Sequence, residues 1–440
     1  MASASSQSGP RQARALRLAR HVKLWLAPAV LSGLVALLLS LLYMGGIVNP
    51  NGHLHRLPIA LVNGDQSPPL PGQPANLGTQ LSRTVIASTA GSTVDWRQLT
   101  AEEAQDQLAT GKVYGALVVP AGFTSSVAAL TTGQATQRPT LTVLTNPGLG
   151  SLGSSLAAQI SQTAAHQASL AIGKQLTEPT QGASGPGGGA GGAAAAAPSA
   201  TAQLLMADPV TVTTQVGHPI GSHSGLGLSA FYYTLLAVLA GFVGGNIIHN
   251  GVDTALGYSD SEIGPWHTRR PTVPINRTQT LLLKMIMTAG IMLLTTTLVM
   301  VGAITILGMD APHQVLLWVF SYCASLAVGL GVQAINAAFG GIGQLVSMFV
   351  FIALALPSSG ATIPLQAVPG FYRFLGLFEP MRQLSEGIRA ILFFDARADA
   401  GLMRAWIMIA VGVVLALAFG FAMTRYYDRK GLHRWTPQPE

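Results

Sequence analysis

Charge is scarce in this chain of 440 residues: Asp, Glu, Lys and Arg make up 9% of it, whereas hydrophobic residues make up 49%. Soluble globular domains carry about 25% charged residues. The composition therefore excludes an ordinary soluble domain. Cysteine is nearly absent as well, because Cys323 is the only one. One thiol cannot form an internal disulfide, so cysteine usage says nothing about the redox compartment.

The familiar motifs of nucleotide binding and catalysis are also missing. The sequence contains no GxxxxGK[ST] phosphate loop and no HExxH, GxSxG or CxxC pattern. We expect neither an enzyme nor a bound cofactor in this chain, since catalysis would need an unfamiliar site. His53 and His55 form an HxH pair without a nearby third ligand, which favours a solvated loop over a metal site.

Long apolar runs dominate what is present. The first contains no charge and is long enough to cross about 30 Å of hydrocarbon as a helix, so we interpret it as an uncleaved membrane anchor. A gap of mostly polar sequence separates it from five more runs. The shortest of these covers residues 342–356. The six predicted spans cover residues 24–47, 226–248, 281–308, 315–335, 342–356 and 405–425.

Basic residues gather next to these runs, and the positive-inside rule places all three groups in the cytoplasm. Six spans then alternate without contradiction, with both termini inside and residues 49–225 outside. A nucleic-acid surface would instead need a soluble basic face with interleaved aromatics, so we expect no nucleic-acid partner. The three groups are Arg11, Arg14, Arg17, Arg20 and Lys23; Arg269, Arg270 and Arg277; and Arg425, Arg429, Lys430 and Arg434.

The segment 49–225 alternates strand and helix patterns, which predicts a small α/β domain with a partly parallel sheet. Thr100 and Glu103 form a capping box at the start of one helix. Residues 182–200 are almost entirely Gly, Ala, Pro and Ser, which is typical of a flexible linker. The predicted strands cover 57–62, 113–119, 140–144 and 209–216, and the predicted helices 100–110, 121–130 and 149–176.

The predicted fold class is an α-helical polytopic membrane protein with six transmembrane helices in a one-plus-five arrangement. An extracytoplasmic α/β domain is inserted between helices 1 and 2. The expected parts are a cytoplasmic basic amphipathic segment (1–23), helix 1 (24–48), the α/β domain (49–225), a five-helix domain (226–425) with a cytoplasmic loop (250–280) and an outer re-entrant or interfacial segment (357–402), and a cytoplasmic tail (426–440).

Four short motifs carry a family resemblance. They are LPIALVNGD at 57–65, VYGALVVPAGF at 113–123, LTVLTNP at 141–147 and PMRQLSEGIR at 380–389. In this order, and with one span before and five after the inserted domain, the chain resembles the phage infection protein (Pip/YhgE-like) branch of the ABC-2 membrane proteins. It departs from that branch in its short outer domain and its Gly/Ala linker, where longer members carry helical insertions.

The resemblance implies the permease subunit of an ABC-2-type exporter in the bacterial plasma membrane, moving a hydrophobic or amphiphilic substrate. Its implied partners are membrane lipid, a second copy or a related permease in a homodimer or heterodimer, and a separate ATPase subunit that holds the ATP. An alternative function is an accessory or scaffold protein of a cell-envelope secretion system, or a phage attachment protein, acting through the outer domain.

Two regions are candidates for coupling to that ATPase. Arg14 and Arg17 belong to an amphipathic segment that would be the connecting helix by resemblance, although a topogenic basic flank explains them equally. The cytoplasmic loop supplies further charges, with a solvated loop as the alternative. These candidates are Asp260, Glu262, Arg269 and Arg270.

Small and polar residues within the spans suggest packing or a substrate path. Gly241 and Gly245 form a GxxxG pair, and Ser325 and Gly329 repeat that spacing, which lets helices approach closely in lipid. The amides Asn246, Gln333 and Asn336 either line a substrate path or join helices by hydrogen bonds. We expect no fixed charge deep in the spans, which weighs against an ion relay.

Pro357, Pro364 and Pro369 break the chain after the fifth span, and Pro380 can begin a new helix. By resemblance this segment closes the exit of the transporter; an amphipathic cap without gating motion is the alternative. Charges of alternating sign follow at separations of three or four, so that they can pair. The predicted outer gate consists of Glu379, Pro380, Arg382, Glu386 and Arg389.

Overall fold

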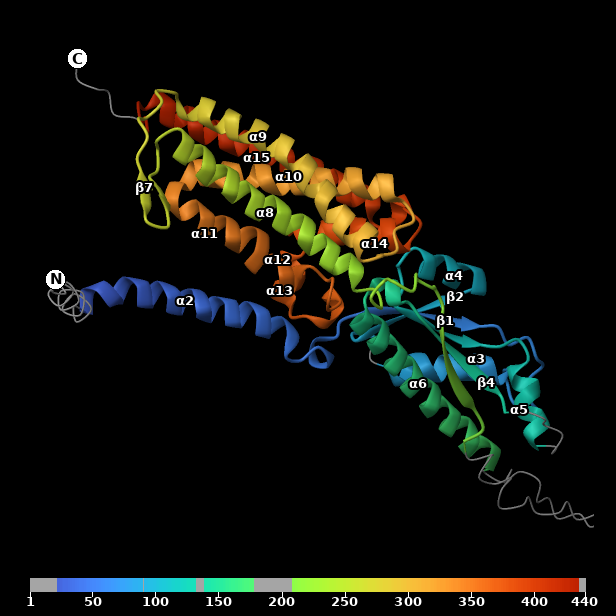
Figure 1. Cartoon of the computed structure of the whole chain (residues 1–440). Coiled ribbons are helices and arrows are strands. Elements are labelled where there is room, and N and C mark those ends of the chain that lie inside the picture. The colour runs from blue at the N-terminus through green and yellow to red at the C-terminus, as the bar shows by residue number, and fades with distance from the viewer. Residues whose placement is uncertain (1–21, 90, 132–137, 178–207, 435–440) are drawn as a thin grey trace, which may run out of the picture.

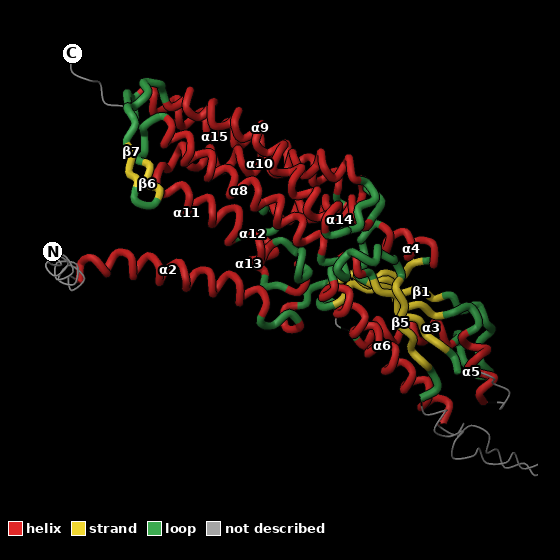
Figure 2. Tube along the Cα trace, viewed as in Figure 1, coloured by secondary structure: helices red, strands yellow, loops and turns green. Residues whose placement is uncertain are grey.

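The computed structural model describes residues 22–89, 91–131, 138–177 and 208–434. The molecule is elongated, with an α/β domain at one end, a bundle of long helices at the other, and helix α2 alongside the bundle (Figure 1). Figure 2 shows the main sheet at one end and a pair of short strands at the opposite end, called the distal end below. The Gly/Ala segment 182–200, Arg14 and Arg17 lie outside the described residues.

The α/β domain contains a mixed sheet of five strands in the order β2-β1-β3-β4-β5. All neighbouring strands are parallel except β3 and β4, which are antiparallel. The first six residues of β1 are buried, as expected for a strand covered on both faces. The strands are β1 (Leu57–Asn63), β2 (Val94–Leu99), β3 (Gly115–Val119), β4 (Thr140–Thr145) and β5 (Thr211–Val216).

Helices cover both faces of this sheet. Helix α4 (Ala101–Ala109) begins with the predicted capping box and packs on β1 and β3 through Ala104 and Leu108. The helices α3 (Leu77–Ser88), α5 (Phe123–Thr131) and α6 (Ser151–Thr177) cover the other face. The strands and helices predicted from the sequence are present here, and β2 and α3 were not predicted.

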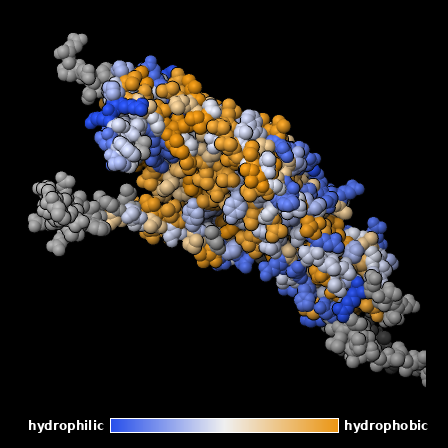
Figure 3. Space-filling view, viewed as in Figure 1, coloured by the Kyte–Doolittle hydropathy of each residue, from blue (hydrophilic) through white to orange (hydrophobic). Residues whose placement is uncertain are grey.

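Four helices are long and apolar enough to cross a membrane among the residues that the structure describes. They are Ser229–Ala255, Arg277–Ile306, Gln314–Ser358 and Leu402–Arg429, and Ser32–Gly46 is a shorter apolar helix. Figure 3 shows hydrophobic residues concentrated over the bundle and hydrophilic ones towards the distal end and the α/β domain. The elements are α2 (Val22–Ile47), α8 (Ser229–Ala255), α9 (Arg277–Met300) with a π-helical turn (Val301–Ile306), α10 (Gln314–Phe339), α11 (Gly343–Met348), a second π-helical turn (Phe349–Ala353), α12 (Ala355–Ser358) and α15 (Leu402–Arg429).

The chain reverses direction within the 45-residue segment Gln314–Ser358. Gly340 has φ +61°, a left-handed conformation that suits glycine, and α10 ends there. Asn336 near the end of α10 bonds to Asn246 in α8, and Gln344 at the start of α11 bonds to Asn250 a turn further on. Ala355 in α12 then packs on Phe231 near the start of α8. Residues 343–358 therefore return antiparallel to α10, in the place where a separate fifth span is predicted.

Helices α8 and α10 lie side by side through their small residues. A Cβ on Gly241 would stand 2.5 Å from the Ser325 carbonyl oxygen, and one on Gly245 would stand 3.0 Å from Val332. The Ser325 hydroxyl donates to the Ala237 carbonyl at 2.9 Å. The two small-residue pairs predicted to pack thus face each other within one chain.

Helix α8 extends seven residues beyond the predicted end of the second span. Residues 250–255 were predicted to begin a loop, but they continue the helix, and Asp253 on its last turn is buried. The prediction that the loop begins at residue 250 is wrong. The helix continues because Asp253 pairs with basic residues from other elements, which allows its charge to be buried in the bundle.

Two helices, α13 (Gly370–Leu375) and α14 (Pro380–Phe393), lie between α12 and α15 at the α/β end of the bundle. Pro380 occupies the first position of α14, where its missing N–H costs nothing. Leu384, Ile388 and Leu392 are buried in the bundle core. The C-terminal end of α2 contacts this region, where the Tyr372 hydroxyl donates to the Leu41 carbonyl at 3.0 Å.

Candidate functional site

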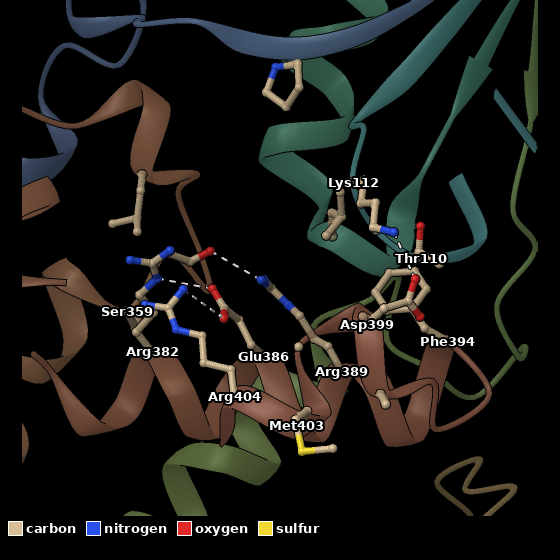
Figure 4. A pocket seen from close by; sticks show the side chains of 18 of the residues that line it. Thr110, Lys112, Ser359, Arg382, Glu386, Arg389, Phe394, Asp399, Met403 and Arg404 are labelled. Atoms are coloured by element: carbon tan, nitrogen blue, oxygen red, sulfur yellow. Dashed lines mark hydrogen bonds and ion pairs between the residues drawn. The ribbon is translucent and has the colours of Figure 1, made fainter. Parts of the chain in front are cut away.

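A cavity of about 610 Å³ lies between the α/β domain and the helices α14 and α15. We call it the junction cavity. Figure 4 shows Arg382, Glu386 and Arg404 grouped on one side of it, with Lys112 beside Asp399 on another. Polar side chains from both halves of the molecule converge here, which is typical of binding sites.

Helix α14 supplies one wall of the junction cavity. Arg382, Glu386 and Arg389 are four and three residues apart, so they share the helix face opposite to the buried apolar one. Arg382 Nε lies 3.1 Å from Glu386 Oε1, as an i,i+4 pair. Arg404 in α15 lies 3.9 Å from the other Glu386 oxygen. One carboxylate therefore stands between two guanidinium groups.

The α/β domain supplies the opposite wall. Lys112 Nζ lies 2.8 Å from Asp399 Oδ2, and this hydrogen bond holds the pKa of Asp399 below its usual range. Tyr114 donates to Gln366 Oε1 at 3.3 Å, and burial raises the pKa of its phenol to about 12. Both contacts join the α/β domain to the segment around α14.

Arg389 does not follow the pairing predicted for this segment. Its side chain is buried, with 6% of the residue exposed. It donates to the carbonyl oxygens of Gly360 at 3.3 Å and Ala361 at 2.6 Å, whereas its Nε has no hydrogen-bond acceptor. Among the described residues no carboxylate lies within ion-pair distance of it. Burial lowers its pKa below the usual value for arginine, but an arginine in a protein stays charged.

Glu379 and Pro380 lie at the start of α14 and are not part of the junction cavity. The Glu379 carboxyl accepts from the backbone N–H of Met381 at 2.8 Å, so it caps the helix and does not pair with Arg382. Burial raises its pKa to about 8. Glu379 is therefore largely protonated at neutral pH.

An apolar groove of about 340 Å³ runs beside the same helices. Its walls come from α10, α14, α15 and the second π-helical turn, and Gln383 is the main polar side chain among them. Met408 in α15 lines both this groove and the junction cavity. The groove continues along α15 to Phe419, a span of about 16 Å at 1.5 Å per residue.

The amides predicted for a substrate path are linked to neighbouring helices. Gln333 donates to the Gly245 carbonyl at 2.9 Å and to Thr288, and Asn336 donates to Asn246 at 3.0 Å. Asn336 also lines a cavity of about 360 Å³ at the distal end of the bundle. The distances show helix–helix hydrogen bonds, and the path along these residues stays a prediction.

A buried ionic cluster lies beside that distal cavity. Asp253 receives Lys284 Nζ at 2.7 Å and both guanidinium nitrogens of Arg434, at 2.8 and 2.9 Å. His249 stands 3.3 Å from the same carboxylate. The cluster lies near the helix ends, with Asp253 on the last turn of α8 and Lys284 two turns inside α9, so the expectation of no fixed charge deep in the spans stays a prediction. The sequence signal was available in Lys284, the charge within an apolar run.

The loop residues predicted to contact an ATPase lie together at the distal end. The strands β6 (Ser261–Ile263) and β7 (Trp266–Thr268) form an antiparallel hairpin. Asp260 lies 3.6 Å from Arg269 and 3.5 Å from His267. Glu262, Trp266, Arg269 and Arg270 are exposed on or beside this hairpin.

In the part of the chain that the structure describes, no three His, Cys, Asp or Glu side chains are placed to hold a metal ion. His53 bonds to the Asn49 carbonyl through its ring, and the His55 N–H donates to the Gln366 carbonyl. Neither histidine lines the junction cavity or the distal cavity, although Gln366, to which His55 bonds, lines the junction cavity.

The long apolar helices and the inserted mixed sheet define a helical membrane protein with an α/β domain. Residues 29–412 match the family described as "Protein of unknown function (DUF3533)", so the chain belongs to that family. It is also similar to the "Uncharacterized protein YhgE" of Bacillus subtilis (strain 168), 26% identical over 111 residues. That match covers 25% of this chain and 14% of the relative. No solved structure matches.

Proposed function

We propose that this protein is the membrane subunit of an ABC-2-type exporter for hydrophobic or amphiphilic molecules, driven by a separate ATPase. The observation that supports this most is the order of its elements. Among the described residues, one long apolar helix precedes the α/β domain and five helical segments follow it, with the shorter α13 and α14 before the last of them. That order agrees with the resemblance found in the sequence.

Six spans follow if α2 and residues 343–358 cross the membrane with the four longer helices. The contacts show that α8 and α10 run in the same direction and that residues 343–358 run in the opposite direction. Alternating spans in a six-helix bundle need these directions. The α/β domain then lies outside the cell, and the distal hairpin and Arg434 lie inside, in agreement with the distribution of basic residues.

The hairpin of β6 and β7 is the proposed contact for the ATPase. It projects from the end of the bundle opposite the α/β domain (Figure 1), and Arg269 is 79% exposed. In an ABC-2 exporter such an element passes the movement of the ATPase to the helices, and α8 leads directly into this one.

The test is purification of the tagged full-length protein from its own cells in mild detergent, with identification of co-purifying proteins and an ATP hydrolysis assay. We expect an ATPase that carries a phosphate loop to co-purify. The double variant Arg269→Glu/Arg270→Glu should lower its recovery or its activity at least about fivefold. The double variant Arg83→Glu/Arg138→Glu changes charge equally on the α/β domain and should leave both unchanged.

Two outcomes would contradict the proposal. Recovery of secretion components without any ATPase would favour the scaffold function acting through the α/β domain. An ATPase whose recovery falls equally in both double variants would show that the hairpin is not its contact.

A further inference from the structure

The junction cavity contains more positive than negative charge. Lys112, Arg382, Arg389 and Arg404 line it, against the two carboxylates Glu386 and Asp399. Each carboxylate already has a partner: Asp399 is bound by Lys112, and Glu386 by Arg382. The positive charges of Arg389 and, largely, of Arg404 are left over.

Such an excess is unfavourable in a buried position unless something compensates it. Moving a charge out of water costs several kcal/mol even after the protein relaxes. Proteins usually pair a buried arginine with a carboxylate, but Arg389 has only two carbonyl dipoles. An anion in the cavity would supply the missing charge, and a guanidinium is well suited to phosphate or carboxylate oxygens.

The surroundings of the cavity restrict the kind of anion. Met403, Ile407 and Met408 of α15 form part of its wall, and Met408 is shared with the apolar groove. A molecule that reaches from the charged cavity into the groove must therefore have a polar head and an apolar tail. The groove walls include Val411, Leu415 and Phe419, which are exposed on the face of the bundle, so a tail can enter from the lipid side.

We propose that the junction cavity binds the anionic headgroup of an amphiphile, with Arg389 and Arg404 at the headgroup and the tail along α15 in the apolar groove. The shared chemistry is a phosphate or carboxylate on a long alkyl chain. That this amphiphile is the transported substrate rests on the proposed function, but its binding can be measured without an ATPase.

The experiment measures the affinity of the purified full-length protein, in a non-ionic detergent, for four probes. Dodecyl phosphate is the test ligand, monododecanoylglycerol its neutral counterpart, hexyl phosphate its short-chain counterpart, and inorganic phosphate the soluble anion. Dodecyl phosphate should bind at least about tenfold more tightly than each of the other three. For the neutral probe, the free energy of one charge-assisted hydrogen bond corresponds to about that factor. For the hexyl and inorganic phosphates, the lost burial of alkyl groups, at about fourfold in affinity per CH2, exceeds it.

Variants locate the two parts of the site. Arg404→Gln should weaken dodecyl phosphate binding about tenfold, whereas Arg425→Gln, near the other end of the same helix, should not. Arg389→Gln should weaken it further, and Arg389→Lys should retain part of the affinity. Gly412 lines the groove, and a Cβ there meets no atom within 4 Å, so the side chain of Gly412→Leu starts in open space. This variant should weaken binding of the long chain but not of hexyl phosphate.

Equal affinity for the neutral and the anionic probe would overturn the proposal, as would equal affinity for inorganic and dodecyl phosphate. If Arg389→Gln fails to fold, unchanged affinity in Arg404→Gln and Gly412→Leu still refutes it. If dodecyl phosphate binds specifically but no ATPase co-purifies, the binding site is supported and the exporter function is rejected. If a coupled ATPase co-purifies but dodecyl phosphate does not bind specifically, the exporter function is supported and the anionic amphiphile is rejected as its substrate class.

Discussion

Asp253 is the residue on which the distal end of the bundle depends most directly. Its side chain is 6% exposed, and it accepts hydrogen bonds from Lys284, which is 4% exposed, and from Arg434. Arg434 also lies over the Tyr258 ring at 4.8 Å, which holds the residues after α15 against the end of α8. One carboxylate thus bonds to two cations from different parts of the chain and offsets one of their two positive charges.

Removing that carboxylate should be costly. In Asp253→Asn, Lys284 is left buried without a full negative charge, and breaking a buried pair in this way costs about 3–5 kcal/mol. The free energy of unfolding in mixed micelles, titrated with a denaturing detergent, measures the effect.

The matched control is Asp260→Asn, which removes an exposed carboxylate from its pair with Arg269. Exposed pairs contribute about 0–1 kcal/mol, so this variant should unfold almost like the parent. Equal losses in the two variants would show that the buried cluster does not stabilise the bundle.

At the scale of elements, the approach of α8 to α10 is decided by two small-residue pairs. Gly241 meets the backbone of Ser325, and Gly329 meets the methyl group of Thr288 in α9, so three helices come together at this level. Gln333 bonds to both Gly245 and Thr288 one turn further on. Close packing brings this amide within reach of both partners, which an amide buried in the bundle needs.

Gly241→Ala should separate the two helices and destabilise the bundle by about 1–3 kcal/mol, because its Cβ would overlap the Ser325 carbonyl. Gly251→Ala, on the same helix, meets no atom within 4 Å and should be neutral or stabilising by up to about 1 kcal/mol through helix propensity. Thermal unfolding followed by circular dichroism compares the two. A Gly241→Ala protein as stable as the Gly251→Ala protein would argue against this packing.

At the scale of the whole molecule, the two ends of the bundle differ in character. One end is covered by the α/β domain, which is joined to α14 and the following turn by Lys112–Asp399, Asp106–Arg397 and a hydrogen bond from His218 to the Phe393 carbonyl. The other end carries the charged hairpin. A membrane between them would separate these ends by the length of the long helices.

This arrangement predicts opposite accessibility at the two ends in intact cells. In a Cys323→Ala background, Glu102→Cys on α4 should react with a membrane-impermeant maleimide added from outside. Trp266→Cys in the hairpin should react only after the cells are opened. Labelling of both cysteines from outside would reject a span between them, and the reverse pattern would invert the proposed orientation.

The long helices of the bundle and most elements of the α/β domain could be predicted from the sequence, because these depend on local chemistry. A long run of apolar residues must form a helix in lipid to satisfy its own backbone, and the Thr100–Glu103 capping box needs only four neighbouring residues. Helix α3 was missed although Leu77, Leu81 and Val85 recur at helical spacing and Asn76 caps its start, whereas the short strand β2 has a half-polar sequence. Helix α2 lies apart from the bundle for no reason visible in its composition.

Which charged residues pair with one another depends on the tertiary structure. Lys112 and Asp399 are 287 residues apart, and Asp253 and Arg434 are 181 apart, so no spacing in the sequence could pair them. The alternating charges of α14 predicted mutual pairing, yet Glu379 caps the helix and Arg389 turns to the carbonyls of a neighbouring loop. Local sequence restricts which residues share a helix face; packing between distant elements decides what that face meets, and here it left a buried arginine beside a cavity.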